Sequence, residues 1–532
     1  MALLRVAAWL VTGVERQVLI HVVADQSEVF AFLGASATHG ISEAVKRIDT
    51  HGAAVFLAGP DVYKVKRAVK FAFMDFSTLE KRRAACEAEI RANQGDSSHI
   101  YLGVVPITRS QGKLHLRGEG EVVEWAVHMR RFDENATLDK LAQRGALTAG
   151  LVADLAVVVA RAHSRAPIRD FDNGAALKGY IVENGESLGE LAEIFPVERV
   201  RRLTEASHAQ LLAHGDLMSE RRKEGYVRRG HGDLHLRNIA LIDGKPVLFD
   251  ALEFDEAMAT GDVLYDLAFL IMDLWERGYE EAANAVLNHY LWEDREPLSI
   301  KGLAQLPLFL SVRAAIRAKV IGFSLPQLGE SQRTQATMEA RRYFSLAEQF
   351  LADTPPRLIA IGGLSGTGKT TIAGMLAPRI GRMPGAVHIR SDIERKLMFE
   401  VSASQRLGEA GYTEIANAEA YARMRRKAGL ALAAGFGVIA DAVYIASEER
   451  RGIERIARDL SCEFAGFWLE APLDLRIGRV QNRKNDASDA DASYLRRQPD
   501  AERGSLSWHR IEASGVASSI LGHLLLRLDG RR

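Results

Sequence analysis

The spacing of apolar and polar residues changes along the chain, and these changes predict where strands and helices lie. Short runs rich in valine, phenylalanine and tyrosine, separated by turn residues such as Gly59-Pro60, are typical of strands. We predict such strands at residues 54–57, 62–66, 113–117 and 122–131. A charged stretch at residues 77–93 has helical character. Because four predicted strands surround this one helix, we predict that this part forms a small lobe rich in β-sheet.

Helical spacing dominates from Leu138 onward, where apolar residues recur three and four positions apart. The clearest of these helices are predicted at residues 147–163, 196–214 and 338–351. The last one runs into Ala352-Asp353-Thr354-Pro355-Pro356, whose two prolines cannot continue a helix. An apolar strand at residues 358–361 follows directly, so we expect a domain boundary at these prolines.

The chain is therefore predicted to contain two domains that both mix helices with strands. The first domain is residues 36–352, with a small lobe at about 36–132, a helical lobe at about 133–352 and a preceding extension of residues 1–35. The second domain is residues 357–532 and begins with a strand that leads through a glycine-rich loop into a helix. We expect an α+β fold for the first domain. For the second we expect an α/β fold, with a parallel sheet flanked by helices.

The glycine-rich loop of the second domain has the pattern of a phosphate-binding loop. Its sequence is Gly363-Leu364-Ser365-Gly366-Thr367-Gly368-Lys369-Thr370, followed by Thr371, and it fits G-x-x-x-x-G-K-[ST] at every position. The glycines allow successive backbone N–H groups to turn towards a phosphate, and the helix N-terminus adds partial positive charge. The lysine of this pattern contacts the β- and γ-phosphates, and the threonine hydroxyl binds Mg²⁺. This domain is therefore predicted to bind a nucleotide, which we expect to be ATP.

Three further features of the second domain are candidates for transfer chemistry. One apolar strand ends in Asp441, the usual place of another Mg²⁺-binding carboxylate, although aspartate at a strand end is also a common turn residue. A second strand leads to Asp392 and Arg395, which can accept a hydroxyl proton and bind an anionic group. Arg479 and Arg483 share one face of a predicted helix, where they either contact the γ-phosphate or form a solvated charged surface.

The first domain contains a second candidate site in its helical part. Asp233 and Asn238 are five residues apart, which is the spacing of a kinase catalytic loop. Asp233 would orient and deprotonate the attacking hydroxyl. Asn238 would bind Mg²⁺ together with Asp250, which a predicted hairpin returns to the same place. His231 is expected to brace the loop, and a loop histidine such as His235 is more often structural than a metal ligand.

Such a site also needs a strand lysine for the α- and β-phosphates and a helix glutamate that pairs with it. Lys64 is the predicted lysine, and Lys66 is the alternative because residues two apart lie on the same face of a strand. Glu89 is the predicted partner on the following helix, and Glu87 is the alternative. Glu253 is a candidate additional ligand for the metal.

The composition narrows the classes of partner. The 532 residues carry 69 basic and 69 acidic side chains, so no net positive field attracts nucleic acid or anionic lipid. Two cysteines, Cys86 and Cys462, cannot make a disulfide framework, which favours the cytoplasm. Charged side chains interrupt residues 2–24 before an apolar run reaches the roughly 18–20 residues that span a membrane. We therefore expect neither a membrane partner nor secretion.

The candidate site of the first domain resembles that of the aminoglycoside phosphotransferase family. The resemblance covers about residues 36–350 and is carried by the runs His231-Gly232-Asp233-Leu234-His235-Leu236-Arg237-Asn238, Phe249-Asp250 and Gly261-Asp262-Val263-Leu264-Tyr265-Asp266-Leu267-Ala268. It implies a bilobal fold like that of protein kinases. It also implies that the carboxylates of the last run tie the catalytic loop to the helical lobe.

The second domain resembles the small P-loop kinases of the gluconate kinase and zeta-toxin type. This resemblance covers about residues 358–498 and rests on the glycine-rich loop, Asp392-x-x-Arg395, Asp441 and the two arginines at 479 and 483. The tandem arrangement is similar to bacterial proteins described as bifunctional aminoglycoside phosphotransferase-like and ATP-binding. It implies transfer of a phosphoryl group to a small-molecule hydroxyl.

Together these features predict a cytoplasmic phosphotransferase that uses ATP and Mg²⁺ at two nucleotide sites, each with a small-molecule hydroxyl as acceptor. In a first alternative, one half is a ligand-sensing module that regulates the other. In a second alternative, the second domain phosphorylates the 5′-hydroxyl of a polynucleotide, because Asp392-x-x-Arg395 also suits such kinases. Zero net charge and few aromatic residues near the site argue against a nucleic-acid partner. The sequence leaves the identity of the acceptor open.

Overall fold

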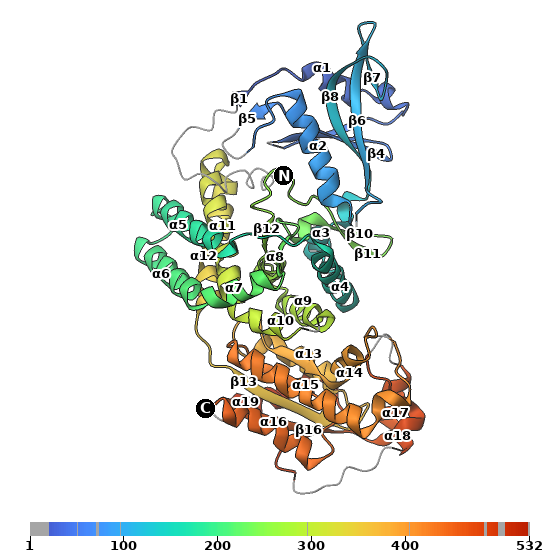
Figure 1. Ribbon diagram of the computed structural model, residues 1–532, viewed down its shortest axis with the longest axis vertical. Coiled ribbons are helices and arrows are strands. Elements are labelled where there is room, and N and C mark those ends of the chain that lie inside the picture. The colour runs from blue at the N-terminus through green and yellow to red at the C-terminus, as the bar shows by residue number, and fades with distance from the viewer. Residues whose placement is uncertain are drawn as a thin grey trace. The chain divides into compact units, whose positions relative to one another are not determined.

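The structure is a computed structural model that describes residues 21–50, 52–70, 74–95, 97–294, 296–403, 405–482, 487–497 and 506–529. The chain forms two compact units (Figure 1). The first unit contains residues up to 277 together with residues 308–351, and the second contains residues 278–307 together with residues from 352 onward. Both units combine helices with sheets, which confirms the fold classes expected from the sequence.

The small lobe of the first unit is built on a six-stranded antiparallel sheet. From edge to edge its strands are β2 (Lys46–Asp49), β3 (Ala53–Ala58), β4 (Asp61–Lys66), β8 (Glu121–Arg130), β6 (Tyr101–Ser110) and β7 (Lys113–Leu116). The predicted hairpin of β3 and β4 is confirmed. β6 was not predicted, because Gly103 and Pro106 interrupt its apolar pattern and the pairing shifts register beside Gly103.

Helices cover both faces of this sheet because alternate residues along its strands point to opposite sides. Val29 and Leu33 of α1 (Ser27–Gly34) are buried with residues of β3, β4 and β6. On the other face, α2 (Leu79–Asn93) packs on β6 and β8 and begins where the Thr78 side chain accepts the N–H of Lys81. A short strand, β1 (His21–Val22), pairs with β5 (Val69–Lys70).

Residues 21–35, which the sequence analysis treated as part of an extension, thus contribute to the core of the small lobe. Residues 1–20 lie outside the described residues, so the expectation about their apolar stretches stays a prediction. Among the described residues, no helix combines the length and the apolar character needed to cross a bilayer.

The helical lobe of the first unit surrounds short strands that carry the catalytic-loop motif. Its main helices are α3 (Leu138–Gln143), α4 (Ala149–Arg165), α5 (Asn173–Glu190), α6 (Val197–Ala213), α7 (Gly215–Lys223), α8 (Val263–Glu276), α11 (Leu306–Ser324) and α12 (Glu330–Leu351). Its strands form two antiparallel pairs, β9 (Val227–Arg229) with β12 (Thr260–Asp262) and β10 (Ile239–Ile242) with β11 (Lys245–Leu248). α5 was not predicted, because it contains four glycines, which disfavour helices.

The second unit contains the predicted parallel sheet. Its strand order is β14 (Val387–Arg390), β15 (Val438–Asp441), β13 (Arg357–Gly363), β16 (Glu463–Glu470) and β17 (His509–Glu512). The central strand β13 is apolar and buried on both faces, as parallel strands between two helical layers usually are. The last two strands of this order were not predicted from the sequence.

Helices flank this sheet and supply the remaining walls of its site. They are α13 (Lys369–Leu376), α14 (Ser391–Met398), α15 (Glu414–Ala433), α16 (Ser447–Asp459), α17 (Leu473–Gln481), α18 (Ala492–Arg497) and α19 (Ala517–Asp529). Two further helices, α9 (Glu280–Glu293) and α10 (Pro297–Gly302), precede β13 by more than 50 residues but belong to this unit. The sequence analysis had assigned them to the first domain.

Candidate active sites

The glycine-rich loop of the second unit lies between the end of β13 and the start of α13. Gly363, Gly366 and Gly368 have φ angles of 138°, 85° and 94°, which residues with a side chain rarely adopt. An added Cβ would lie 2.5 Å from the Leu469 carbonyl oxygen at Gly363 and 2.7 Å from the Arg476 carbonyl oxygen at Gly366. Glycine is therefore required at these two positions for both conformation and space.

Side chains hold this loop in place from both sides. The Thr367 hydroxyl donates to the Leu364 carbonyl at 2.9 Å, and the Lys369 ammonium donates to the same carbonyl at 3.2 Å. Arg479 on α17 donates to the Thr367 carbonyl at 3.1 Å and to the Ala513 carbonyl at 2.8 Å. Arg479 therefore contacts the loop itself, whereas its predicted companion Arg483 lies outside the described residues.

The structure brings Thr370 and Asp441, the two predicted Mg²⁺ ligands of this unit, into direct contact. The Thr370 hydroxyl donates to Asp441 Oδ2 at 2.7 Å, and His388 Nε2 lies 3.3 Å from the same oxygen. Burial would raise the pKa of Asp441, but His388 and Lys369 outweigh it and bring that pKa to about 2. Asp441 is therefore ionised at neutral pH, and two oxygen ligands of the kind that Mg²⁺ prefers are available next to the loop.

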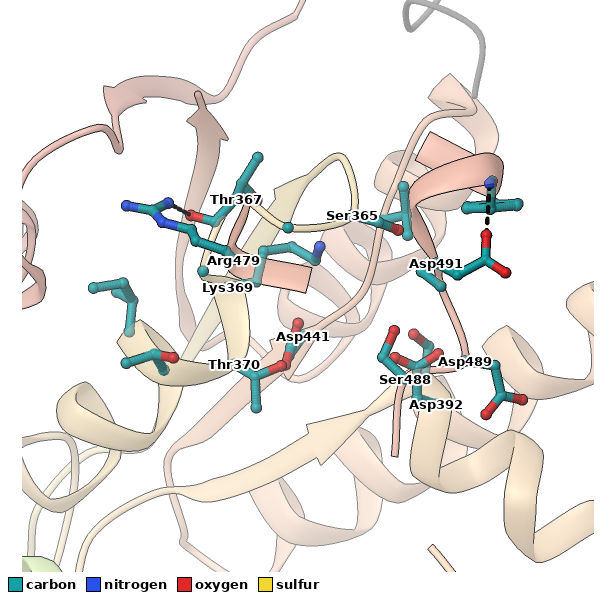
Figure 2. Close-up of a pocket in the computed structure, with 18 of the residues that line it drawn as sticks. Ser365, Thr367, Lys369, Thr370, Asp392, Asp441, Arg479, Ser488, Asp489 and Asp491 are labelled. Atoms are coloured by element: carbon teal, nitrogen blue, oxygen red, sulfur yellow. Dashed lines mark hydrogen bonds between the residues drawn. The ribbon is translucent and has the colours of Figure 1, made fainter. Parts of the chain in front are cut away.

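A cavity of about 1340 Å³ opens beside this loop and is lined by Lys369, Asp441, Asp392, Arg395 and Arg479, among others. Figure 2 shows Asp392 gathered with Ser488 and Asp489 on the side of the cavity opposite Arg479. Burial raises the pKa of the Asp392 carboxyl, although Arg390 and Lys369 counteract it. A carboxylate with a raised pKa that faces a nucleotide loop suits proton transfer.

Arg395 is fixed in the wall of this cavity. Its Nη1 donates to the Gly411 carbonyl at 2.8 Å, and its guanidinium lies over the Tyr412 ring. The Tyr412 hydroxyl in turn donates to Asp489 at 2.8 Å, and the buried Lys396 ammonium lies 2.6 Å from Asp489. The sequence pattern did not point to Lys396 or Tyr412, because their contacts depend on Asp489, which is 93 residues from Lys396 and 77 residues from Tyr412.

In the first unit, Asp233 and Asn238 meet as their spacing predicted. The Asn238 side-chain amide donates to the carbonyl and to the Oδ2 of Asp233, both at 3.0 Å, which leaves Asn238 Oδ1 for another ligand. His235 Nε2 lies 3.3 Å from Asp233 Oδ2. Burial would raise the pKa of Asp233, but His235 and His231 outweigh it and hold the pKa below the usual range.

The loop that carries Asp233 is anchored by α8 through Asp266, as the resemblance implied, whereas Asp262 pairs with the buried Arg221 instead. Asp266 accepts the backbone N–H of His231 at 2.7 Å and of Gly232 at 3.1 Å. Asp273, about two turns further along α8, accepts the N–H of Leu236 at 3.0 Å. His231 Nε2 also contacts the Phe249 carbonyl at 2.9 Å, which agrees with a bracing role.

The segment that carries Asp250 is held at each of its residues. Asp250 has a φ of 59°, and its N–H donates to the Tyr101 hydroxyl oxygen at 3.0 Å. The next N–H, of Ala251, donates to Asn93 Oδ1 at 3.0 Å, and that of Leu252 donates to the His231 carbonyl at 2.9 Å. Such contacts over-determine an unusual backbone conformation and fix the direction of the carboxylate.

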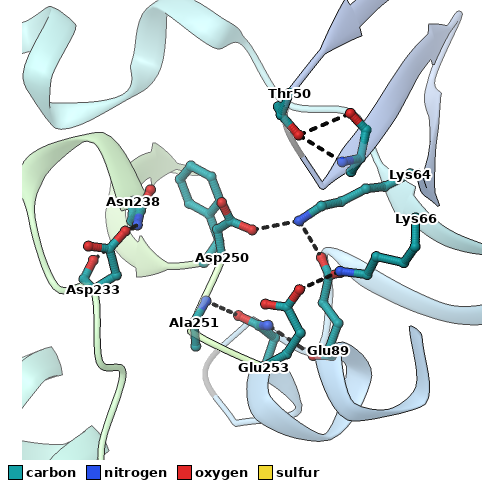
Figure 3. Close-up of polar contacts among 12 residues, drawn as sticks. Thr50, Lys64, Lys66, Glu89, Asp233, Asn238, Asp250, Ala251 and Glu253 are labelled. Atoms are coloured by element: carbon teal, nitrogen blue, oxygen red, sulfur yellow. Dashed lines mark hydrogen bonds and ion pairs between the residues drawn. The ribbon is translucent and has the colours of Figure 1, made fainter. Parts of the chain in front are cut away.

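Both candidate lysines of the small lobe contact Glu89 (Figure 3). Lys64 Nζ lies 2.8 Å from one oxygen of Glu89 and 2.7 Å from Asp250 Oδ1. Lys66 Nζ lies 2.5 Å from the other oxygen of Glu89 and also pairs with Glu253. The geometry therefore favours Lys64 for phosphate contact and gives Lys66 a structural partner in Glu253, which was a candidate metal ligand.

The buried carboxylate of Glu89 is stabilised by these two cations. Burial would raise its pKa, but Lys64 and Lys66 bring it to about 2. The alternative partner Glu87 is only partly buried and pairs instead with Arg83 at 2.9 Å. Glu89 therefore fits the role of the helix glutamate.

The oxygen donors in both units fit Mg²⁺ that arrives with a nucleotide. Asn238 Oδ1 and the Asp250 carboxylate would supply ligands in the first unit, and the Thr370 hydroxyl and Asp441 would do so in the second. Among the described residues, no group of three or more His, Cys, Asp or Glu side chains is placed to hold a metal by itself. Nucleotide phosphates and water would complete the coordination, as is usual for Mg²⁺.

We predict that Gly366→Ala lowers the affinity of the second unit for ATP at least tenfold. The added Cβ would press against the Arg476 carbonyl, and the strained φ would cost about 1–3 kcal/mol. The measurement is titration calorimetry with ATP on the binding event that Lys369→Ala removes. Gly374→Ala is the matched control, because an added Cβ there meets open space within α13. Equal affinities of the two variants would contradict the prediction.

We predict different effects for the two small-lobe lysines. Lys66→Met leaves the buried Glu89 and Glu253 without their shared cation and should lower the free energy of unfolding by about 3–5 kcal/mol. Lys64→Met should mainly weaken nucleotide binding, because Lys64 is less buried and faces Asp250. Denaturant unfolding and ATP titration separate the two effects, with Lys113→Met on the exposed β7 as control. The assignment fails if Lys66→Met removes ATP binding from a stable protein.

Family models match both parts of this arrangement. Residues 113–300 match the phosphotransferase enzyme family, and residues 358–502 match an AAA domain family. Among solved structures, a choline/ethanolamine kinase family protein from Mesorhizobium loti is 13% identical with a TM-score of 0.36, and the alignment covers 61% of this chain and 98% of that one. A gluconokinase from Sinorhizobium meliloti is 18% identical with a TM-score of 0.24, and the alignment covers 34% and 99%, respectively.

The similarity to two mycobacterial proteins extends over both units. Uncharacterized proteins from Mycobacterium tuberculosis and Mycobacterium bovis are each 30% identical to this chain over 488 residues. These alignments cover 89% of this chain and 93% of each relative. The chain therefore belongs to the same family as these mycobacterial proteins, and it is a kinase in which a phosphotransferase domain precedes a P-loop kinase domain.

Proposed function

We propose that the protein uses Mg-ATP at two sites, one in each unit, and that each site transfers the γ-phosphoryl group to a hydroxyl of a small metabolite. The cavity of the second unit is the observation that carries this proposal. It has Lys369 and the Thr370–Asp441 pair on the nucleotide side and Asp392 across from them. A site with these four groups can bind a triphosphate and activate a hydroxyl in one cavity.

In the second unit, the loop N–H groups and Lys369 would bind the nucleotide phosphates, and Thr370 and Asp441 would hold Mg²⁺, which neutralises phosphate charge when bound. Asp392 would orient the acceptor hydroxyl and take its proton. The hydroxyl oxygen then bonds to the γ-phosphorus, the bond to the β–γ bridging oxygen breaks, and ADP leaves with that electron pair. Arg395 and Arg479 would contact anionic groups of the acceptor and the nucleotide.

In the first unit, Asp233 is the proposed residue that orients the acceptor hydroxyl, and its lowered pKa keeps it ionised. Asn238 Oδ1 and Asp250 would hold the metal, and Lys64, positioned by Glu89, would contact the α- and β-phosphates. The cysteines support the cytoplasm as the compartment, because Cys86 and Cys462 are both free.

A second candidate function is that the first unit senses a ligand and regulates the second. One contact favours it: Lys64 and Asp250, the residues proposed for phosphate and metal, are paired with each other at 2.7 Å. Nucleotide must compete with this pairing, so the first unit would respond to nucleotide concentration even without turnover.

The proposal predicts two separable activities in the full-length protein. We expect that Lys369→Ala and Asp392→Asn each lower the phosphorylation of one acceptor by about 10²–10⁴-fold, whereas Asp233→Ala lowers that of another. The measurement is Mg-ATP turnover with a panel of sugars, sugar acids, amino sugars, nucleosides and an oligonucleotide, with Lys113→Met as control. Loss of one activity in all three variants would refute two independent sites. Loss of none would refute the proposed chemistry, and phosphorylation of the oligonucleotide would support polynucleotide kinase activity.

A further inference from the structure

The edge strand β14 of the second unit is covered by a helix instead of another strand. It is the last strand on its side of the sheet, so one row of its backbone groups points away from β15. An exposed row of this kind needs hydrogen-bond partners and is often covered by a helix. Here α9 supplies the partners from its side chains.

Three side chains of α9, each four positions from the next, contact this row. The Asn284 amide donates to the carbonyls of Pro384 and Ala386 at 3.0 and 3.1 Å. Asn288 Oδ1 accepts the N–H of His388 at 2.7 Å, and Trp292 Nε1 donates to the carbonyl of His388 at 2.8 Å. Residues spaced by four lie on one face of a helix, so a single face of α9 binds the backbone from Pro384 to His388 at this edge.

These contacts concentrate on His388. Asn288 accepts its N–H and Trp292 donates to its carbonyl, and only about 3% of the His388 surface and of the Asn288 surface is exposed. The imidazole of His388 points towards Asp441, and its Nε2 lies 3.3 Å from Asp441 Oδ2. The same oxygen accepts the hydroxyl of Thr370.

We propose that Asn288 and Trp292 are positioning residues of the P-loop site: they fix the backbone of His388, which in turn fixes the Asp441 carboxylate for metal binding. This inference rests on the proposed role of Asp441 and extends it to a helix that supplies none of the residues lining the cavity and precedes the P-loop in sequence. A carboxylate that binds Mg²⁺ must point in one direction, because Mg²⁺ demands near-octahedral geometry. Groups that orient metal ligands from behind usually change metal affinity when they are removed.

The P-loop unit therefore includes a helix that precedes its glycine-rich loop by more than 60 residues. The match to the phosphotransferase enzyme family extends to residue 300 and includes α9, but α9 completes the sheet edge of the second unit. Only residues 277–279 separate α9 from α8, whose Asp266 and Asp273 anchor the catalytic loop of the first unit. Consecutive helices therefore position the candidate metal site of one unit and the catalytic loop of the other.

The test is a Mg²⁺ titration of the full-length protein. The signal is the ATP hydrolysis that Lys369→Ala removes, which reports the P-loop site alone. We expect Asn288→Ala and Trp292→Phe each to raise the half-saturating Mg²⁺ concentration about fivefold, the equivalent of one lost hydrogen bond. Trp292→Phe keeps an aromatic ring beneath the Arg390 guanidinium and removes only the N–H donor.

Asn284→Ala is the matched control, because Asn284 is the same residue type on the same face of α9 but binds the backbone ahead of His388 and reaches His388 only through Asn288, whose Nδ2 donates to Asn284 Oδ1 at 3.0 Å. It should lower the midpoint of thermal unfolding and shift the Mg²⁺ dependence less than Asn288→Ala does. If Asn284→Ala shifts the Mg²⁺ dependence as much as Asn288→Ala does, the shift reflects only a less stable sheet edge, and the positioning role is overturned.

A further variant separates this inference from the proposed function. Asp441→Asn should raise the Mg²⁺ requirement more than either α9 variant does. If Asp441→Asn leaves the Mg²⁺ dependence unchanged, the proposed metal site fails. If Asp441→Asn shifts it but Asn288→Ala and Trp292→Phe do not, only the positioning role fails. A second readout is the midpoint of thermal unfolding of the protein with a non-hydrolysable ATP analogue, measured with and without Mg²⁺. The increase that Mg²⁺ causes is compared among the same variants and does not require turnover.

Discussion

The buried carboxylate of Asp441 is the constraint on which the second unit depends. Parallel pairing of β15 with β13 places Asp441 opposite Ile361, two residues before the glycine-rich loop. A buried charge is tolerated only when polar partners satisfy it, and Thr370 and His388 do so here. The sheet order, the loop conformation and the cover of β14 by α9 all serve to keep these three groups together.

The first unit meets a similar requirement with a different arrangement. Glu89 has essentially no exposed surface, and one ammonium group contacts each of its oxygens. Lys66 extends the network to Glu253, and Lys64 extends it to Asp250, so the segment after β11 is tied to α2 and β4. Each charge depends on the others, and removal of one member leaves a buried charge without compensation.

The pKa values of the two proposed catalytic carboxylates are shifted in opposite directions by their surroundings. Asp233 is surrounded by histidines that lower its pKa, whereas burial raises the pKa of Asp392. The first environment favours orientation of a hydroxyl by an ionised carboxylate, and the second favours acceptance of its proton. Two such sites in one chain are consistent with two different acceptors.

The sequence by itself determined the parts of both sites that lie close together in the chain. The P-loop between β13 and α13, and the contact of Asp233 with Asn238, follow from glycine positions and short spacings, because local backbone geometry closes such loops. Tertiary structure alone placed Lys64 beside Asp250, 186 residues away, and this contact supports the proposed choice of Lys64 over Lys66. It also assigned α9 to the second unit through bonds that span about 100 residues, such as Asn284 to Pro384. Apolar periodicity specifies which face of an element is buried but not which distant element it meets, so these pairings depend on packing of the whole fold.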